Sequence, residues 1–206
     1  AVSAAKQRLG FLASGGGTNL QAILDACTTG QLDAEPRVVI SNNSTAGALK
    51  RARSAHIATC HLSGRTHHDP FALDAAICDT LQAHDVQVVW LAGYMKKLGP
   101  QTLSDYHRRV LNVHPALLPN HGGQGFYGER VHAAVLAAGD TVSGVTVHLV
   151  DGEYDQGPVV DQQTVPVEQN DTVERLAARV LAVEHVLYPV TLQKIARGQI
   201  DLDAVG

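Results

Sequence analysis

The chain has 206 residues, which is enough for one α/β domain with a sizeable core and leaves little room for a second domain. Hydrophobic residues make up 45% of the sequence, an ordinary share for a globular protein that argues against disorder. The net charge of −4 excludes the basic surface that nucleic acids or anionic membranes require, so any phosphate group must be held by a local site.

Apolar runs alternate with amphipathic segments through the first half of the chain. The predicted elements are, in order, a strand at 9–13, a helix at 20–26, a strand at 38–40, a helix at 46–55, a strand at 58–62, a helix at 71–83, a strand at 86–91, a short helix from Pro100 and a strand at 110–114. This alternation predicts an α/β fold: a mostly parallel, Rossmann-like twisted sheet with helices on both faces.

The pattern changes in the second half, where four glycines between 122 and 128 indicate a mobile loop. A helix at 131–138 and two strands at 142–150 and 159–165 follow, and the strands are expected to pair as an antiparallel edge. A capping-box pattern at 171–174 opens a long helix, which we expect Pro189 to kink or break. No linker or repeat divides the chain, so we expect a single domain over 1–206, with loose tails at 1–7 and 201–206.

Cysteine, histidine and terminal patterns carry little functional signal. Cys27, Cys60 and Cys78 are odd in number and lack metal-type spacing, which is typical of buried thiols in a reducing cytosol. The eleven histidines form no zinc motif, so no metal is expected. No apolar run has spanning length and the first residues lack a signal-peptide core, so we expect a cytoplasmic protein with no membrane partner.

The first candidate motif, Ser14-Gly15-Gly16-Gly17-Thr18-Asn19, lies directly between a predicted strand and a predicted helix. Glycines let the backbone approach an anion closely, and the helix start offers unpaired N–H groups and a positive dipole end. The spacing matches neither the dinucleotide fingerprint nor a P-loop. A plain glycine turn with Thr18 or Asn19 as N-cap is an equally good interpretation of the motif alone.

The second motif is Asn112-Val113-His114-Pro115. Asn112 and His114 are two apart on a strand, so their side chains share one face, and Pro115 ends the strand there. The pair therefore lies at the carboxyl end of a strand, where open α/β sheets bind ligands. An amide donor beside an imidazole suits a developing oxyanion, although a core histidine beside a turn asparagine remains the alternative.

The third motif joins a strand bearing Thr146 and His148 on one face to an acidic turn, 151–158, that ends in Gly-Pro. An aspartate held in this turn can fix the tautomer of a nearby histidine and raise its pKa. An ordinary solvated turn is the alternative for Asp151 and Glu153.

Five segments together resemble the phosphoribosylglycinamide formyltransferases, which use 10-formyltetrahydrofolate as co-substrate. They are SGGGTNLQAIL, LAGYMKKL, NVHPALLP, VTVHLVDGEYDQGP and VEHVLYP, in one order between about Arg8 and Arg197. The resemblance implies the formyltransferase fold, a single formyltransferase domain, small-molecule substrates, no metal, and a monomer or homodimer.

The resemblance also implies roles for individual residues. Asn112, His114 and Asp155 would be catalytic, with protonated His114 and Asn112 stabilising the oxyanion and Asp155 supporting the imidazolium. The phosphoribosylglycinamide would be bound by Gly17, Thr18, Asn19 and Glu184. The folate would be bound by Met95, Lys96, Lys97, Leu98, Asn112, Asp151, Gly152, Glu153, Tyr154 and Asp155.

Some features depart from the family, and other functions compete. An arginine that often meets the folate tail is absent near Asp69-Pro70, and lysine replaces arginine in LAGYMKKL. The segment 120–130 is long, and we expect it to act as a lid that orders on ligand binding. The rivals are formyltetrahydrofolate hydrolase, which usually carries an additional N-terminal domain, methionyl-tRNA formyltransferase, which needs a C-terminal domain and a basic face, and a non-catalytic nucleotide-binding domain.

Overall fold

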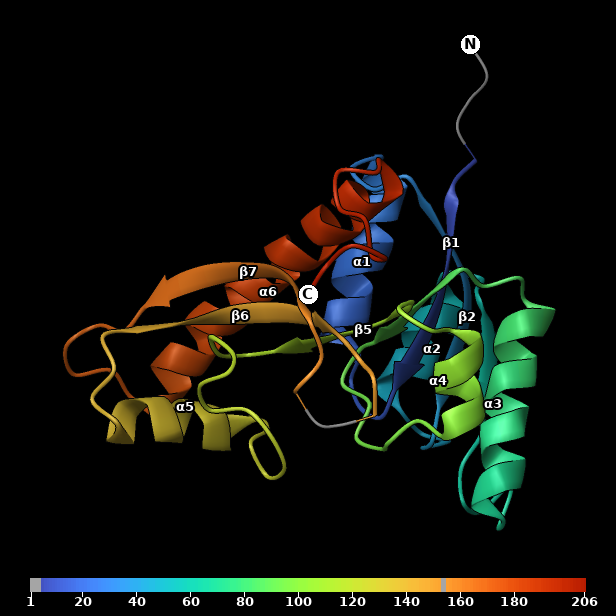
Figure 1. Cartoon of the computed structure of the whole chain (residues 1–206), viewed down its shortest axis with the longest axis horizontal. Coiled ribbons are helices and arrows are strands. Elements are labelled where there is room, and N and C mark those ends of the chain that lie inside the picture. The colour runs from blue at the N-terminus through green and yellow to red at the C-terminus, as the bar shows by residue number, and fades with distance from the viewer. Residues whose placement is uncertain (1–4, 153–154) are drawn as a thin grey trace.

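The computed structural model describes residues 5–152 and 155–206. Figure 1 shows a central sheet flanked by helices. Its strands are β1 (Gln7–Ala13), β2 (Ala34–Ser41), β3 (Ala58–His61), β4 (Val88–Leu91), β5 (Val110–His114), β6 (Val142–Leu149) and β7 (Val159–Pro166). Its helices are α1 (Thr18–Thr29), α2 (Gly47–Ser54), α3 (Pro70–Ala83), α4 (Pro100–Asp105), α5 (Glu129–Ala137) and α6 (Val173–Ala196). Every element expected from the sequence is present, with ends shifted by a few residues.

The seven strands form one sheet in the order β3-β2-β1-β4-β5-β6-β7. Neighbouring strands from β3 to β5 are parallel, whereas β6 runs antiparallel to both β5 and β7. The predicted fold class is therefore confirmed, including the antiparallel edge. Strand order reverses between β1 and β4, and the crevice outside the carboxyl ends of two such strands is where open α/β sheets bind ligands.

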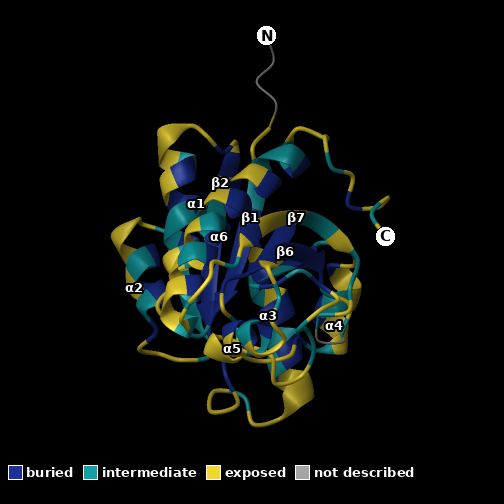
Figure 2. Cartoon of the chain, turned by 90° about the vertical axis from the view of Figure 1, so that its left-hand side faces the viewer, coloured by how far each residue is buried: buried dark blue, intermediate teal, exposed yellow. Residues whose placement is uncertain are grey.

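Two apolar layers hold the helices on the sheet, because alternate strand residues face opposite sides. Leu9, Phe11 and Ala13 of β1 join a core that includes α1, α2 and α6, whereas Leu12 joins the core under α3. In Figure 2 the buried residues follow the strands and the inner sides of the helices. No helix in the described ranges 5–152 and 155–206 is long and apolar enough to cross a membrane.

In the C-terminal part of the chain, Pro189 does not break its helix, and the last residues are not a loose tail. Helix α6 continues from Val173 to Ala196 with Pro189 inside it. The buried packing of Leu187, Tyr188 and Leu192 outweighs the ~3 kcal/mol that an interior proline costs a helix.

The C-terminal residues 201–206 are not a loose tail. Leu202 is buried, its carbonyl accepts a 2.8 Å hydrogen bond from Arg108, and Asp203 pairs with Arg109 at 2.9 Å. At the other end, Gln7 already belongs to β1, and residues 1–4 lie outside the described part of the chain.

Candidate active site

A cavity of about 660 Å³ lies at the carboxyl ends of the central strands. The segment after β4, the end of β5 and the glycine-rich loop before α5 form much of its wall. The end of β6 and the turn after it also contribute, together with one residue of α1, Asn19, and two of α6, Glu184 and Tyr188. The cavity therefore lies at the position that strand order predicts for a ligand site.

Asn112, His114 and Asp155 all line this cavity. His114 Nδ1 lies 3.4 Å from Asp155 Oδ2, and the two side chains are 4% and 9% exposed. The structure thus brings together two groups 41 positions apart (155 − 114) in a nearly water-free setting. There, hydrogen bonds and charges act more strongly than in water.

A close chain crossing fixes the position of Asp155. A Cβ atom on Gly157 would lie 1.7 Å from the carbonyl oxygen of Leu149, so only glycine lets the turn fold back onto the end of β6. Asp155 itself adopts a left-handed conformation with φ of 55°. Its Oδ2 also accepts a 3.0 Å hydrogen bond from the Gly123 N–H, which ties the turn to the glycine-rich loop.

His148 is a fourth member of this centre, although the sequence did not single it out as a site residue. Its Nε2 lies 3.4 Å from Asp155 Oδ1 and 3.5 Å from Asn112 Nδ2. The antiparallel register of β5 and β6 places His148 directly opposite Asn112. The shared strand face of Thr146 and His148 was visible in the sequence, but the register that makes it relevant was not.

Burial and charge oppose each other in this cluster. Burial lowers the pKa of His114, and the nearby Asp155 carboxylate and the His121 carbonyl only partly offset that effect. Burial would raise the pKa of Asp155, but hydrogen bonds and the charges of His148 and His114 outweigh it, so this pKa is lowered. The arrangement favours an ionised Asp155 beside a His114 that is mostly neutral at pH 7. Asp155 thus raises the pKa of His114, as expected, but burial lowers it by more.

The loop before α5 contacts the centre directly. The carbonyl oxygen of His121 lies 2.6 Å from His114 Nε2. The His121 ring reaches away from the centre, and its Nε2 lies 2.7 Å from Asp140 Oδ2. In this conformation both ring nitrogens of His114 therefore face oxygen atoms of the protein.

The glycine motif forms an open helix start rather than a capped turn. Gly17 is the N-cap of α1 with φ of 75°, and no side chain caps the helix. A Cβ atom on Gly17 would lie 2.8 Å from Ala48 Cα, so the loop packs tightly against α2. The alternative with Thr18 or Asn19 as N-cap is excluded, and the start of α1 presents N–H groups that can bind an anion.

Glu184 faces the same cavity from α6. It is 7% exposed, and Asn19 Nδ2 lies 3.4 Å from its Oε2. Burial raises the pKa of Glu184 to about 7. A carboxylate with this pKa can hold or release a proton near neutral pH.

Among the residues in the described ranges, no group of three or more His, Cys, Asp or Glu side chains could hold a metal ion. The three cysteines are free thiols.

A family model for formyl transferases matches residues 7–192. The chain belongs to the formyl transferase family. It is 39% identical to the phosphoribosylglycinamide formyltransferase of Escherichia coli (strain K12) over 191 residues, covering 93% of this chain and 88% of that protein. These matches confirm the resemblance drawn from the five sequence motifs.

Other relatives of this formyl transferase are longer. The chain is 38% identical to the chloroplastic phosphoribosylglycinamide formyltransferase of Vigna unguiculata, covering 97% of this chain and 64% of that protein. It is 37% identical to the trifunctional purine biosynthetic protein adenosine-3 of Bos taurus, covering 98% of this chain and 19% of that protein. The chain thus spans between one fifth and about two thirds of these two relatives.

Solved structures show the same fold. Glycinamide ribonucleotide transformylase 1 from Symbiobacterium toebii superposes with a TM-score of 0.87 at 41% identity, covering 95% of this chain and 90% of that one. A formyltetrahydrofolate deformylase from Pseudomonas syringae pv. tomato superposes with a TM-score of 0.81 at 26% identity, covering 94% and 62%.

The residues that the motifs nominated for substrate and folate mostly meet at the cavity of this formyl transferase. Met95, Lys96, Lys97, Leu98, Gly152 and Asn19 line it. Gly17 and Thr18 lie at the adjacent start of α1, and Asp151 is exposed outside the lining. Glu153 and Tyr154 lie outside the described residues. The cavity also has lining residues that sequence reasoning missed, among them Tyr94, Leu103, Arg130 and Tyr188.

Proposed function

We propose that this chain transfers the formyl group of 10-formyltetrahydrofolate to the amine of 5′-phosphoribosylglycinamide, giving formylglycinamide ribonucleotide and tetrahydrofolate. One observation carries the proposal: the Asn112–His114–Asp155 centre, Glu184 and the open start of α1 share one cavity or its edge. The names of the E. coli and S. toebii relatives support the same reaction.

The cavity fits a folate co-substrate in size and lining. Its volume of about 660 Å³ lies within the range of ligand sites, and Met95 is 55% exposed beside it. We assign the folate to Met95, Lys96, Lys97, Leu98 and Asn112, with Asp151, Gly152 and Asp155 of the following turn. Glu153 and Tyr154 remain predictions for the same turn. The co-substrate supplies the formyl group on N10.

The phosphoribosylglycinamide would lie between the start of α1 and Glu184. Backbone N–H groups at Gly17, Thr18 and Asn19 suit its phosphate. The Glu184 carboxylate would accept a hydrogen bond from the glycinamide amine and orient its lone pair toward the formyl carbon, because a fixed nucleophile lowers the entropic part of the barrier.

The chemistry then follows from the centre. The amine nitrogen bonds to the formyl carbon, and the carbonyl oxygen becomes an oxyanion that accepts a hydrogen bond from Asn112 Nδ2. His114, mostly neutral at pH 7 because burial lowers its pKa, takes the proton that the amine loses and returns it to N10 as the C–N10 bond breaks. Asp155 stabilises the imidazolium in between.

Hydrolysis is the second candidate, because water could replace the amine at the same centre. The deformylase of known structure favours this alternative, although it is only 26% identical and this chain covers 62% of it. The Glu184 carboxylate suits an amine and the open start of α1 suits a phosphate, so together they favour a phosphorylated amine over water as the acceptor. A non-catalytic role would leave the buried Asn–His–Asp centre without a purpose.

The direct test is to follow release of tetrahydrofolate from 10-formyltetrahydrofolate with and without phosphoribosylglycinamide. Release that depends on the amine, with one formylated product per folate, is the expected result. Release at the same rate without the amine would identify a hydrolase, and no release would identify a binding domain. A cytoplasmic location and a monomeric or dimeric state stay predictions.

A further inference from the structure

The glycine loop is held from behind by helix α2. A Cβ atom on Gly47 would lie 3.0 Å from Gly16 Cα, and one on Gly17 would lie 2.8 Å from Ala48 Cα. These separations are closer than ordinary side-chain contact. The backbone of the loop therefore lies directly against the start of α2.

Two successive carbonyl groups of the loop turn toward α2. The Ala48 N–H donates a 3.0 Å hydrogen bond to the Gly15 carbonyl. Arg51 Nε donates a 2.7 Å hydrogen bond to the Gly16 carbonyl. In a trans peptide the N–H points opposite to the C=O, so the N–H groups of Gly16 and Gly17 point away from α2. In the described part of the chain, neither N–H donates to a protein acceptor.

Arg51 has no carboxylate partner among the residues that the structure describes. Its guanidinium contacts the Gly16 carbonyl and, at 3.4 Å, Gln21 Oε1. A cation on a carbonyl oxygen polarises that peptide and strengthens the N–H on its far side as a donor. Because no acid neutralises it, the Arg51 charge also adds to the positive potential of the loop.

We propose that Arg51 is a positioning residue for the substrate phosphate, acting through the Gly16–Gly17 peptide. This inference rests on the proposed function, since it assigns the phosphate to the glycine loop. Helix α2 holds the Gly15 and Gly16 carbonyls toward itself, so the N–H groups of Gly16 and Gly17 face outward. Arg51 fixes and polarises the second of these two peptides, Gly16–Gly17. Successive outward N–H groups of this kind form anion-binding nests in other proteins.

The test uses Arg51→Met, which keeps the length of the side chain and removes its charge and donors. The KM for phosphoribosylglycinamide should rise about tenfold, the size of one lost charge-assisted hydrogen bond, while kcat and the KM for the folate stay within twofold. The KM for the dephosphorylated glycinamide riboside should not change. A general loss of fold would weaken both substrates equally, so that result would overturn the proposal.

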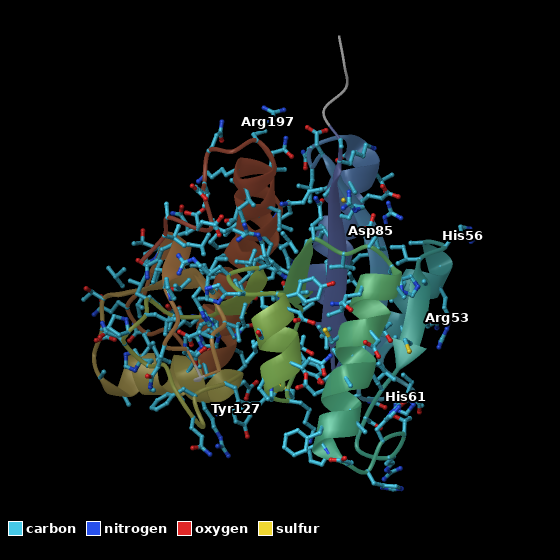
Figure 3. The ribbon with its side chains drawn as sticks, turned by 45° about the vertical axis from the view of Figure 1, so that its right-hand side comes forward. Arg53, His56, His61, Asp85, Tyr127 and Arg197 are labelled. Carbon is cyan, nitrogen blue, oxygen red and sulfur yellow. The ribbon has the colours of Figure 1, made fainter. Side chains whose placement is uncertain are left out.

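Two variants serve as controls. Arg51→Lys keeps the charge and should restore part of the affinity for the phosphorylated substrate. Arg53 is an exposed residue of the same helix, and Figure 3 shows its side chain pointing away from the body of the protein. Arg53→Ala removes the same charge there and should leave the KM for phosphoribosylglycinamide unchanged. An Arg53→Ala effect as large as that of Arg51→Met would contradict the assignment.

A binding measurement keeps this inference separate from the catalytic proposal. When inorganic phosphate is titrated into each protein, the wild type should have a dissociation constant about tenfold lower than that of Arg51→Met. If the wild-type protein transfers no formyl group but shows this difference, the proposed function fails and the Arg51 inference stands. Equal phosphate binding by the two proteins overturns the inference.

Discussion

The burial of Glu184 makes the stability of the folded chain depend on pH. Glu184 is 7% exposed, and burial raises its pKa from 4.5 to about 7. Between these two values the folded chain binds a proton that the unfolded chain has released. The folded state is therefore destabilised progressively as pH rises through this window, by up to about 3 kcal/mol at pH 8.

The variant Glu184→Gln should remove that loss, because the amide cannot ionise. Its free energy of unfolding in urea should change less between pH 5 and pH 8 than that of the wild type, and it should be the more stable of the two at pH 8. Formyl transfer should fall, since the amide no longer accepts a hydrogen bond from the amine in the same way. The exposed Glu174→Gln on the same helix is the matched control, and equal pH slopes in all three proteins would contradict the account.

Residue patterns alone could predict the Asn112–His114 pair but not its partners. Two residues on one strand face beside a proline are a local signal. Asp155 reaches His114 only because Gly157 crosses Leu149 closely, and His148 joins only through the β5–β6 register. Both depend on how distant segments pack, which no local spacing encodes.

The loop from 120 to 128 contacts the Asn112–His114–Asp155 centre at two points. The His121 carbonyl oxygen is within hydrogen-bond distance of His114 Nε2, and the Gly123 N–H donates a hydrogen bond to Asp155 Oδ2. Phe126 and Tyr127 are 38% and 49% exposed, and Figure 3 shows Tyr127 at the lower edge of the molecule. For His114 Nε2 to meet a substrate, the His121 carbonyl must give way, so the loop has to move.

Limited proteolysis by chymotrypsin tests the predicted lid, because Phe126 and Tyr127 are sites for this protease. Adding 10-formyltetrahydrofolate together with phosphoribosylglycinamide should slow cleavage after these residues at least severalfold, since an ordered loop fits a protease poorly. Cleavage after Phe71, which is 74% exposed at the start of α3, should be unaffected. Equal cleavage of the loop with and without both substrates would count against a lid.

Strands and helices could be predicted where the hydrophobic period was clear, but not where tertiary packing determined how far an element continues. The strand–helix alternation predicted the parallel sheet, and the two successive strands at 142–150 and 159–165 predicted the antiparallel edge. Local propensity predicts a kink or a break at Pro189, and burial on α1 and the sheet prevents the break.

At the scale of the whole molecule, the order of the strands determines where chemistry can occur. Residues of α1, after β1, pack in one core of the sheet, whereas Leu98, Leu103 and Tyr106, after β4, pack in the other. The Met95 N–H donates a 2.9 Å hydrogen bond to Ser14 Oγ, which joins the two connections. The loop after β1, the segment after β4 and the Asn112–His114–Asp155 centre therefore meet at one edge of the sheet. Sequence motifs identified these segments separately, and only the topology brings them together.

The central claim is that Asn112 and His114 carry out formyl transfer, and kcat of their alanine variants tests it most directly. Asn112→Ala should lower kcat for amine-dependent transfer by ~10²–10³-fold, the usual cost of losing a donor to a developing oxyanion. His114→Ala should lower it by ~10²–10⁴-fold, the usual contribution of a positioned general acid–base group. The exposed His68→Ala should retain wild-type kcat. If both active-site variants folded as the wild type and kept kcat within a factor of about three, the assignment of this centre would be contradicted.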